Sequence, residues 1–170
     1  MNFDGSDQQY VVALDKQTGK VAKKMGLEKW QPVIDVNLTG TFVVCRACLP
    51  HLRASGTGTI VNLSSVAARL GAPGQYVDYA AAKGAIDAFT IGLSKEVAAE
   101  GIRVNAVRPG LIDTDIHASG GLPNRVKDLQ HLVPAKRGGT AEEVAQAIVW
   151  LLSDKAEYTT MSFLDVSGGR

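Results

Sequence analysis

Hydrophobic and polar residues follow two kinds of spacing along this chain. Apolar residues recur every three or four positions from about Glu28 to Arg53, which predicts a long helix. An alanine-rich segment from about Val77 to Glu100 predicts a second helix, and Thr-Ala-Glu-Glu at 140–143 has the form of a capping box that opens a third, ending at Leu152. Short, almost wholly apolar runs at 59–63, 102–107 and 162–166 predict buried strands.

The order of these elements limits the fold. Helices that alternate with short apolar strands favour parallel strand pairing with right-handed crossovers, and therefore a layered α/β fold. In such a sheet, ligands bind beyond the carboxyl ends of the strands. Ser64 and Ser65 follow the first strand, and Pro109, Gly110 and Thr114 follow the second. We expect the chemistry of the protein at these positions.

Length, composition and charge narrow the possible functions. The 170 residues, 45% of them hydrophobic, suffice for one domain with a buried core. Lysine and arginine number 18 against 17 aspartate and glutamate, so no excess charge favours nucleic acid or an anionic membrane as a partner. We find neither an N-terminal leader nor an apolar window of membrane-spanning length, and expect a cytoplasmic protein. The Cys45-x-x-Cys48 pair lies inside a helical pattern, where two small residues on one helix face are expected rather than a metal or redox site.

Tyr79 and Lys83 form the clearest candidate for chemistry. They are four residues apart near the start of the alanine-rich helix, so their side chains share one face. Tyrosine is a poor base at neutral pH, but a neighbouring lysine cation favours the phenolate, and we expect it to lower the pKa of Tyr79. A serine hydroxyl from the adjacent strand end would hold a carbonyl or alcohol within reach of this tyrosine.

Four motifs together indicate a family. They read DVNLTGTF at 35–42, IVNLSS at 60–65, YAAAK at 79–83 and RVNAVRPG at 103–110. In order and spacing the chain from Glu28 to Arg170 resembles the short-chain dehydrogenase/reductase family, most closely its glucose/ribitol dehydrogenase type. The resemblance implies a Rossmann-like, doubly wound parallel sheet. It also implies hydride transfer between NAD or NADP and a small-molecule carbonyl or alcohol substrate.

The resemblance further implies roles for single residues. Tyr79 would be the general acid or base, and Lys83 would lower its pKa and hold the nicotinamide ribose. Ser65 would orient the substrate, with Ser64 as the second choice. Asn37 would anchor a water molecule of a proton relay, unless it only bends its helix. The cofactor would be contacted by Tyr79, Lys83, Pro109, Gly110, Ile112 and Thr114.

Two larger features follow from the same resemblance. Residues from Ile116 to Val133, which read as a loop with a short helix, would form a lid over the substrate, with Gly120-Gly121 supplying flexibility. The helices at 28–53 and 77–100 correspond to those that build the tetramer core of family members. We therefore expect a homo-oligomer formed through these two helices.

The N-terminal part of the sequence does not match the family pattern. We find no Gly-rich phosphate-binding turn of the form G-x-G-x-x-G or T-G-x-x-x-G-x-G, so we expect a truncated sheet that lacks the dinucleotide-binding half. Residues 1–27 form a separate segment, in which strand, polar turn and strand weakly resemble one repeat of a quinoprotein-type β-propeller. One such repeat cannot form a propeller. The segment from Tyr10 to Leu14 could instead cover the open edge of the three-stranded sheet.

Three interpretations of the function remain open at the level of sequence. The chain could be an NAD(P)-dependent oxidoreductase, a non-catalytic oligomer-forming remnant, or the product of a truncated or fused reading frame. Met161 is a further departure, because similar sequences usually have glycine before the last strand, and we expect it to crowd that turn. Neither the choice between NAD and NADP nor the substrate can be predicted.

Overall fold

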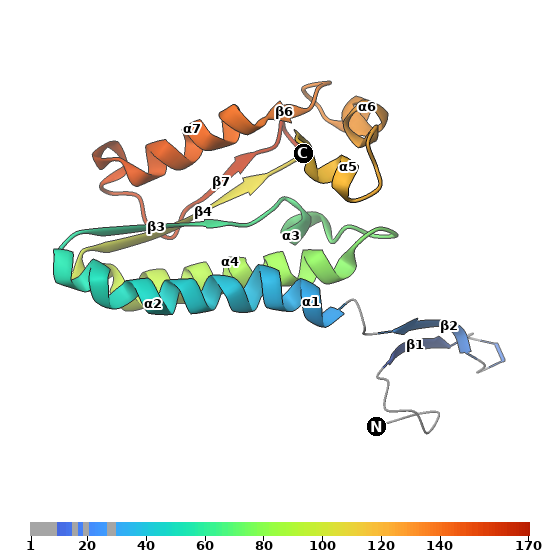
Figure 1. The fold of residues 1–170 in the computed structure, drawn as a ribbon, viewed down its shortest axis with the longest axis horizontal. Coiled ribbons are helices and arrows are strands. Elements are labelled where there is room, and N and C mark those ends of the chain that lie inside the picture. The colour runs from blue at the N-terminus through green and yellow to red at the C-terminus, as the bar shows by residue number, and fades with distance from the viewer. Residues whose placement is uncertain (1–9, 15–16, 19–20, 27–29) are drawn as a thin grey trace.

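The computed structural model describes residues 10–14, 17–18, 21–26 and 30–170, and its centre is a three-stranded parallel sheet (Figure 1). The strands are β3 (Gly58–Leu63), β4 (Ile102–Pro109) and β7 (Phe163–Val166), in the order β3-β4-β7. Ile60 pairs with Val104, and Val107 pairs with Leu164. Parallel pairing of the three predicted strands is therefore confirmed.

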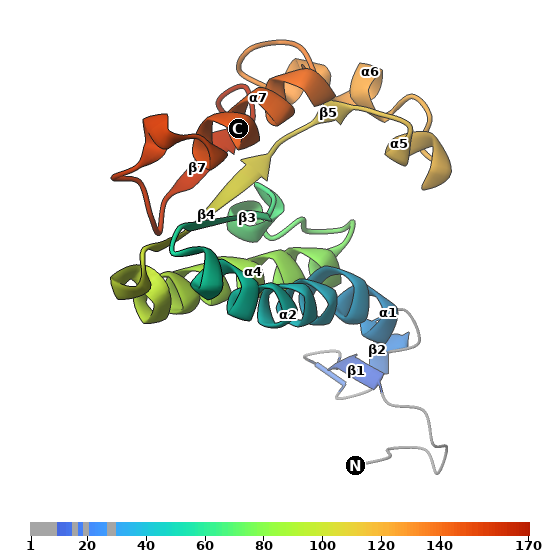
Figure 2. The ribbon, with the colours of Figure 1, turned by 60° about the vertical axis from the view of Figure 1, so that its left-hand side comes forward.

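Helices cover both faces of this sheet. In Figures 1 and 2, α2 (Gly40–Ser55) and α4 (Val77–Val97) lie on one face and α7 (Ala141–Leu152) lies on the other. The β3–α4–β4 and β4–α7–β7 crossovers thus pass on opposite sides of the sheet, which confirms the doubly wound α/β fold. The capping box at Thr140 is also confirmed.

The core is divided by the sheet into two parts. Cys45, Leu93, Val97, Ile102 and Val104 form one buried cluster, and Val107, Val144 and Leu151 form the other. Since side chains alternate between the faces of a strand, β4 contributes Ile102 and Val104 to one cluster and Val107 to the other. A strand buried on both sides explains why Val104, Ala106 and Val107, which point to different faces, are all apolar.

Short elements gather beyond the carboxyl ends of β3 and β4, as Figure 1 shows. They are α3 (Ala67–Leu70), β5 (Ile112–Asp113), α5 (Ile116–Ser119), α6 (Arg125–Leu129) and β6 (Gly139–Thr140). β5 and β6 pair in parallel as a small separate sheet. The predicted lid segment is therefore two short helices followed by a 3₁₀ turn at Gln130–Leu132. Two further 3₁₀ turns, Ala98–Glu100 and Asp154–Ala156, follow α4 and α7.

The first predicted helix is interrupted. Its described part consists of α1 (Trp30–Ile34), a π-helical turn at Asp35–Thr39 and then α2, and its expected start at Glu28 lies outside the described residues. The Gly40 amide donates to the Asp35 carbonyl, which is the i to i+5 bond of a π turn. Asn37, the polar residue that could bend this helix, lies within the π-helical turn.

This first helix also bears on the question of a membrane. The segment Trp30–Ser55 is long and apolar enough to span one by length and composition, contrary to the expectation that no such window exists. Its inner face nevertheless contributes Cys45 to the core, with Leu49 and Leu52 packed against the same cluster. Only 6% of this window is buried in the structure, so the segment packs on the core through a narrow inner face and is not a mostly buried core helix.

The N-terminal strands form their own sheet. β1 (Tyr10–Leu14) pairs antiparallel with β2 (Val21–Gly26), so the predicted strand–turn–strand is confirmed for the described residues. The expectation that Tyr10–Leu14 covers the edge of the three-stranded sheet is wrong, because its partner is β2. A hairpin partner a few residues away closes a much shorter loop than a distant sheet edge does.

Candidate active site

The candidate residues meet beside a cavity at the carboxyl end of the sheet. Ser65 follows β3, Tyr79 lies in the first turn of α4, and Pro109 and Gly110 end β4. These four residues line a cavity of about 600 Å³, together with Ser64, Ile112 and Thr114 from the predicted set. The position agrees with the rule that parallel sheets bind ligands beyond their carboxyl ends.

The two adjacent serines have different surroundings. The Ser64 hydroxyl lies 2.6 Å from Asp87 Oδ1 and 3.3 Å from the Lys83 carbonyl oxygen, and it is almost fully buried. The Ser65 hydroxyl accepts a hydrogen bond from the Ala67 amide at 3.1 Å. Hydrogen bonding between the Ser65 and Tyr79 side chains favours a lower pKa of Tyr79. The Ser64 hydroxyl is therefore occupied by hydrogen bonds to α4, whereas the Ser65 hydroxyl lies beside Tyr79.

Burial dominates the electrostatics of Tyr79. It raises the pKa of Tyr79 above its ordinary value, while the Ser65 side chain acts in the opposite direction and Tyr76 adds to the rise. The expectation of a lowered pKa is therefore wrong for this site. The reason is that desolvation disfavours the phenolate more than the site stabilises it.

Lys83 is buried beneath the tyrosine. Its Nζ donates a hydrogen bond to the Leu63 carbonyl at 2.7 Å and lies 5.5 Å from the centre of the Tyr79 ring. Burial lowers the pKa of Lys83, against the opposing effect of Asp87. The amine is thus fixed between the end of β3 and Tyr79 and is not among the described residues that line the cavity.

The second strand end supplies one wall of the cavity. A Cβ at position 110 would lie 2.7 Å from the Ser167 Cα, so only glycine allows β4 to approach the chain after β7 this closely. Ile112 of β5 and Thr114, which follows β5, continue this wall.

Asn37 is not brought into the cavity. It lies in the π-helical turn, which packs against α4, and its side-chain amide donates to the Val33 carbonyl at 3.0 Å. Its own carbonyl accepts a hydrogen bond from the Thr41 hydroxyl. Its role in a proton relay stays a prediction.

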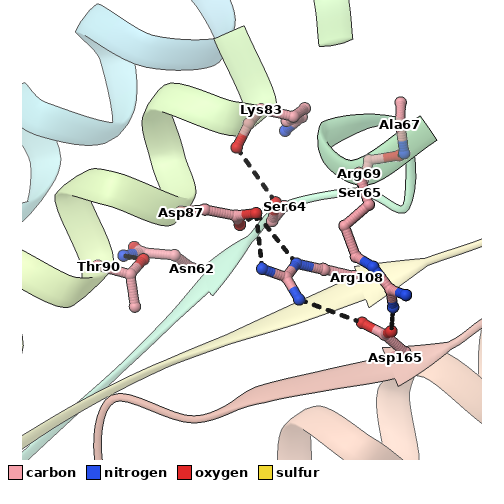
Figure 3. Close-up of polar contacts among 10 residues, drawn as sticks. All are labelled: Asn62, Ser64, Ser65, Ala67, Arg69, Lys83, Asp87, Thr90, Arg108 and Asp165. Carbon is pink, nitrogen blue, oxygen red and sulfur yellow. Dashed lines mark hydrogen bonds and ion pairs between the residues drawn. The ribbon is translucent and has the colours of Figure 1, made fainter. Parts of the chain in front are cut away.

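A polar network that the sequence did not reveal lies behind the serines. Figure 3 shows Arg108 of β4 between Asp87 of α4 and Asp165 of β7, at 2.8 Å and 3.6 Å respectively. Arg69 of α3 also pairs with Asp165. The network ties α4, the two strands and α3 together around the cavity. Its members are 96 residues apart in sequence at the extremes, so no local spacing could have indicated it.

A second cavity of about 200 Å³ adjoins the first. Ser65, Tyr76, His117 and Arg125 line both cavities. The His117 Nε2 lies 2.7 Å from the Ile112 carbonyl oxygen. Tyr76 stands three residues before Tyr79 and its ring meets that of Tyr79 edge-on, a spacing that could have been noticed in the sequence.

The cysteine pair is divided between interior and surface. Cys45 is buried, with its thiol 3.7 Å from Asn62 Oδ1, whereas Cys48 is exposed. The two residues are three positions apart on α2, as expected, but only Cys45 reaches the core. Burial raises the pKa of the Cys45 thiol.

The fold and the site define an α/β domain with serine, tyrosine and lysine at the carboxyl end of a doubly wound sheet, and comparison with known proteins identifies its family. A family model described as Enoyl-(Acyl carrier protein) reductase matches residues 10–170. The chain belongs to the short-chain dehydrogenase/reductase family. The match includes the hairpin, and the boundary that we expect at residue 28 stays a prediction.

Three similar proteins illustrate the relationship. The uncharacterized oxidoreductase YgfF of Escherichia coli (strain K12) is 60% identical over 84% of this chain and 59% of its own length. The 3-oxoacyl-[acyl-carrier-protein] reductase FabG of Chlamydia muridarum is 43% identical over 86% of this chain and 58% of its own. The crystal structure of 3-oxoacyl-[acyl-carrier protein] reductase from Brucella melitensis superimposes with a TM-score of 0.78 and 41% identity, covering 85% of this chain and 54% of that one. The chain thus spans little more than half the length of these relatives.

Proposed function

We propose that this chain carries the catalytic residues of an NAD(P)-dependent oxidoreductase that interconverts a carbonyl and an alcohol. The observation that carries the proposal is the position of Ser65 and Tyr79 on one cavity at the carboxyl end of the sheet, with the Lys83 amine buried 5.5 Å from the centre of the Tyr79 ring. The similarity to reductases of 3-oxoacyl groups supports the same class of reaction.

The residues suggest how a carbonyl would be reduced. The Ser65 hydroxyl would donate a hydrogen bond to the carbonyl oxygen and hold it next to Tyr79. Because burial raises the pKa of Tyr79, its neutral form predominates at neutral pH, and this form can donate a proton to the developing alkoxide. In the reverse direction the Tyr79 phenolate would accept the proton of the alcohol.

The larger cavity fits the nicotinamide end of a dinucleotide. Its lining is mostly apolar, with Pro109, Gly110, Ile112 and Thr114 along one side and Tyr79 on the other. When bound, a nicotinamide supplies or accepts the hydride. Lys83 would donate a hydrogen bond to a ribose hydroxyl of this cofactor, which requires its amine to turn from the Leu63 carbonyl toward the cavity.

Titration calorimetry with NADH and with NADPH tests the proposal first, followed by assays of carbonyl reduction. We expect binding of one of the two cofactors. Tyr79→Phe should then lower kcat by about two to four orders of magnitude, the usual contribution of general acid catalysis, with little effect on cofactor binding.

Tyr158→Phe is the matched control, since Tyr158 is fully exposed and distant in sequence from the site. An enzyme in which both variants keep full activity would contradict the assigned role of Tyr79. A folded chain that binds neither cofactor would exclude the oxidoreductase function and leave the non-catalytic, oligomer-forming interpretation.

A further inference from the structure

Arg125 carries a positive charge that no acidic side chain balances. Its guanidinium is half-buried, donates a hydrogen bond to the Gln75 side-chain oxygen at 2.7 Å and donates another to the Tyr76 hydroxyl. It also lies 5.1 Å from the centre of the Tyr76 ring. All of these partners are neutral, and within the described part of the chain no carboxylate lies within ion-pair distance of Arg125.

Four other arginines of the described chain, Arg53, Arg69, Arg108 and Arg137, each pair with an aspartate or glutamate. Arg103 instead donates to the backbone carbonyls of Leu151, Ser153 and Thr159 and lines neither cavity. A guanidinium that is withdrawn from water needs compensation, and carboxylates provide it best because their two oxygens match the guanidinium fork. Arg125 has no such partner among the described residues, and it lines both cavities, where a ligand could supply one.

That place is the wall shared by the two cavities. Arg125 and Ser65 line both of them, and no described residue that lines either cavity has a side-chain carboxylate. Gln75 and Tyr76, which lie in the segment between Ser65 and Tyr79, hold the Arg125 guanidinium in place through their hydrogen bonds. The positive charge is therefore held on the substrate side of the candidate catalytic residues.

We infer that Arg125 binds a carboxylate of the substrate, which is accordingly a small oxo acid or hydroxy acid. This inference rests on the proposed function and names its substrate class. The reacting carbonyl would lie at Ser65 and Tyr79, and the carboxylate would lie a few bonds away in the cavity of about 200 Å³. Tyr76 and Gln75 act as positioning residues for the guanidinium.

A carboxylate fits this position better than a phosphate group. Phosphate sites usually combine several donors, such as a helix N-terminus or a cluster of cations, around a doubly charged group. Here two guanidinium groups, those of Arg125 and Arg170, line the small cavity, and part of the Arg125 fork is already used by neutral oxygens. The remaining part of the Arg125 fork matches one planar carboxylate.

Binding without cofactor tests the inference directly. Acetoacetate is the probe, acetoacetamide is its neutral counterpart of nearly equal shape, and inorganic phosphate is the third arm, each measured by saturation-transfer NMR titration. We expect acetoacetate to bind roughly tenfold or more tightly than acetoacetamide, because a hydrogen bond to a charged group contributes about 1.5–3 kcal/mol, and phosphate to bind weakly. Arg125→Gln should remove this preference, and Arg125→Lys should retain part of it.

Lys127→Gln is the matched control, because Lys127 is an exposed cation on the same short helix and does not line either cavity. It should keep the preference for acetoacetate. Equal binding of acetoacetate and acetoacetamide by the unmodified chain would overturn the inference, as would an unchanged preference in a folded Arg125→Gln variant. Binding of phosphate as tight as that of acetoacetate would overturn the assignment to a carboxylate.

The outcomes separate the inference from the proposed function. If neutral carbonyls are reduced in a Tyr79-dependent manner but no carboxylate preference exists, only the inference fails. If acetoacetate binds through Arg125 but no cofactor binds, only the oxidoreductase function fails.

Discussion

At the scale of single residues, Met161 shows a conflict between side chain and backbone. Its φ angle is 58°, in the left-handed region that favours glycine. The Met161 amide donates to the Val104 carbonyl at 2.8 Å, which holds the turn before β7 against β4 in this conformation. The expected crowding is absent because the side chain is 42% exposed. The cost lies in the backbone instead.

Met161→Gly should therefore stabilise the domain. A left-handed conformation costs an L-residue about 1–2 kcal/mol, and the greater freedom of glycine in the unfolded chain offsets part of this gain, so we expect about 0.5–1 kcal/mol. Urea denaturation of the two proteins measures the change. Met161→Ala retains the Cβ and should gain much less, and an equal gain in both variants would show that the side chain, not φ, is responsible.

Which residue properties could be predicted depends on how local they are. The shared face of Tyr79 and Lys83 follows from four residues of helix and was predictable. The direction of the pKa shift of Tyr79 was not, because its burial depends on the packing around α4. Arg125 and its partner Gln75 are 50 residues apart, so only the folded chain reveals their contact.

At the scale of elements, the start of α7 is fixed by a capping box with an added ion pair. The Glu143 amide donates to the Thr140 hydroxyl at 3.2 Å, and the Thr140 amide donates to the Glu143 carboxylate at 2.8 Å. Arg137 also pairs with this carboxylate. Together these contacts lower the pKa of Glu143 to about 2, with the Arg137 side chain as the largest cause.

Glu143→Gln should destabilise the domain at neutral pH and have a smaller effect in acid. A carboxyl whose pKa is lowered by folding contributes stability above its unfolded pKa of 4.5, and this contribution is lost as the pH falls toward 2. Urea denaturation gives the free energy of unfolding of the variant and the parent at pH 7 and at pH 3. We expect the two free energies to differ less at pH 3 than at pH 7. Glu142→Gln, at an exposed position of the same turn, should show no such narrowing.

Elements were predictable where one local pattern controls them. The capping box and the apolar strand runs located α7, β3, β4 and β7 to within two residues. The π turn at Asp35–Thr39 was not predictable from spacing, since one shifted hydrogen bond leaves the apolar periodicity almost unchanged. The partner of β1 was predicted wrongly, because an open sheet edge and the second strand of a hairpin both present backbone N–H and C=O groups for pairing.

At the scale of the whole molecule, the helices on one side of the sheet expose several hydrophobic residues. Exposed hydrophobic residues on α1, the π turn, α2 and α4 are Trp30, Val36, Phe42, Val43, Val44, Val77 and Ile91. In Figure 2 these helices lie side by side on the outer face of the sheet. A surface that presents apolar side chains along two adjacent helices is typical of a contact between identical chains. This agrees with the prediction of a homo-oligomer formed through the helices at 28–53 and 77–100.

Val44→Asp tests whether this face joins the chains. Val44 is 61% exposed on α2, so a carboxylate there would be tolerated in a free chain but would be forced out of water in an interface. We expect sedimentation velocity to show an oligomer for the parent and a monomer for the variant. Val149→Asp on α7 introduces the same charge at a 64% exposed position on the opposite side of the sheet and should leave the contact through α2 and α4 intact. Dissociation by Val149→Asp alone would place the interface on α7, and a monomeric parent would refute the predicted oligomer.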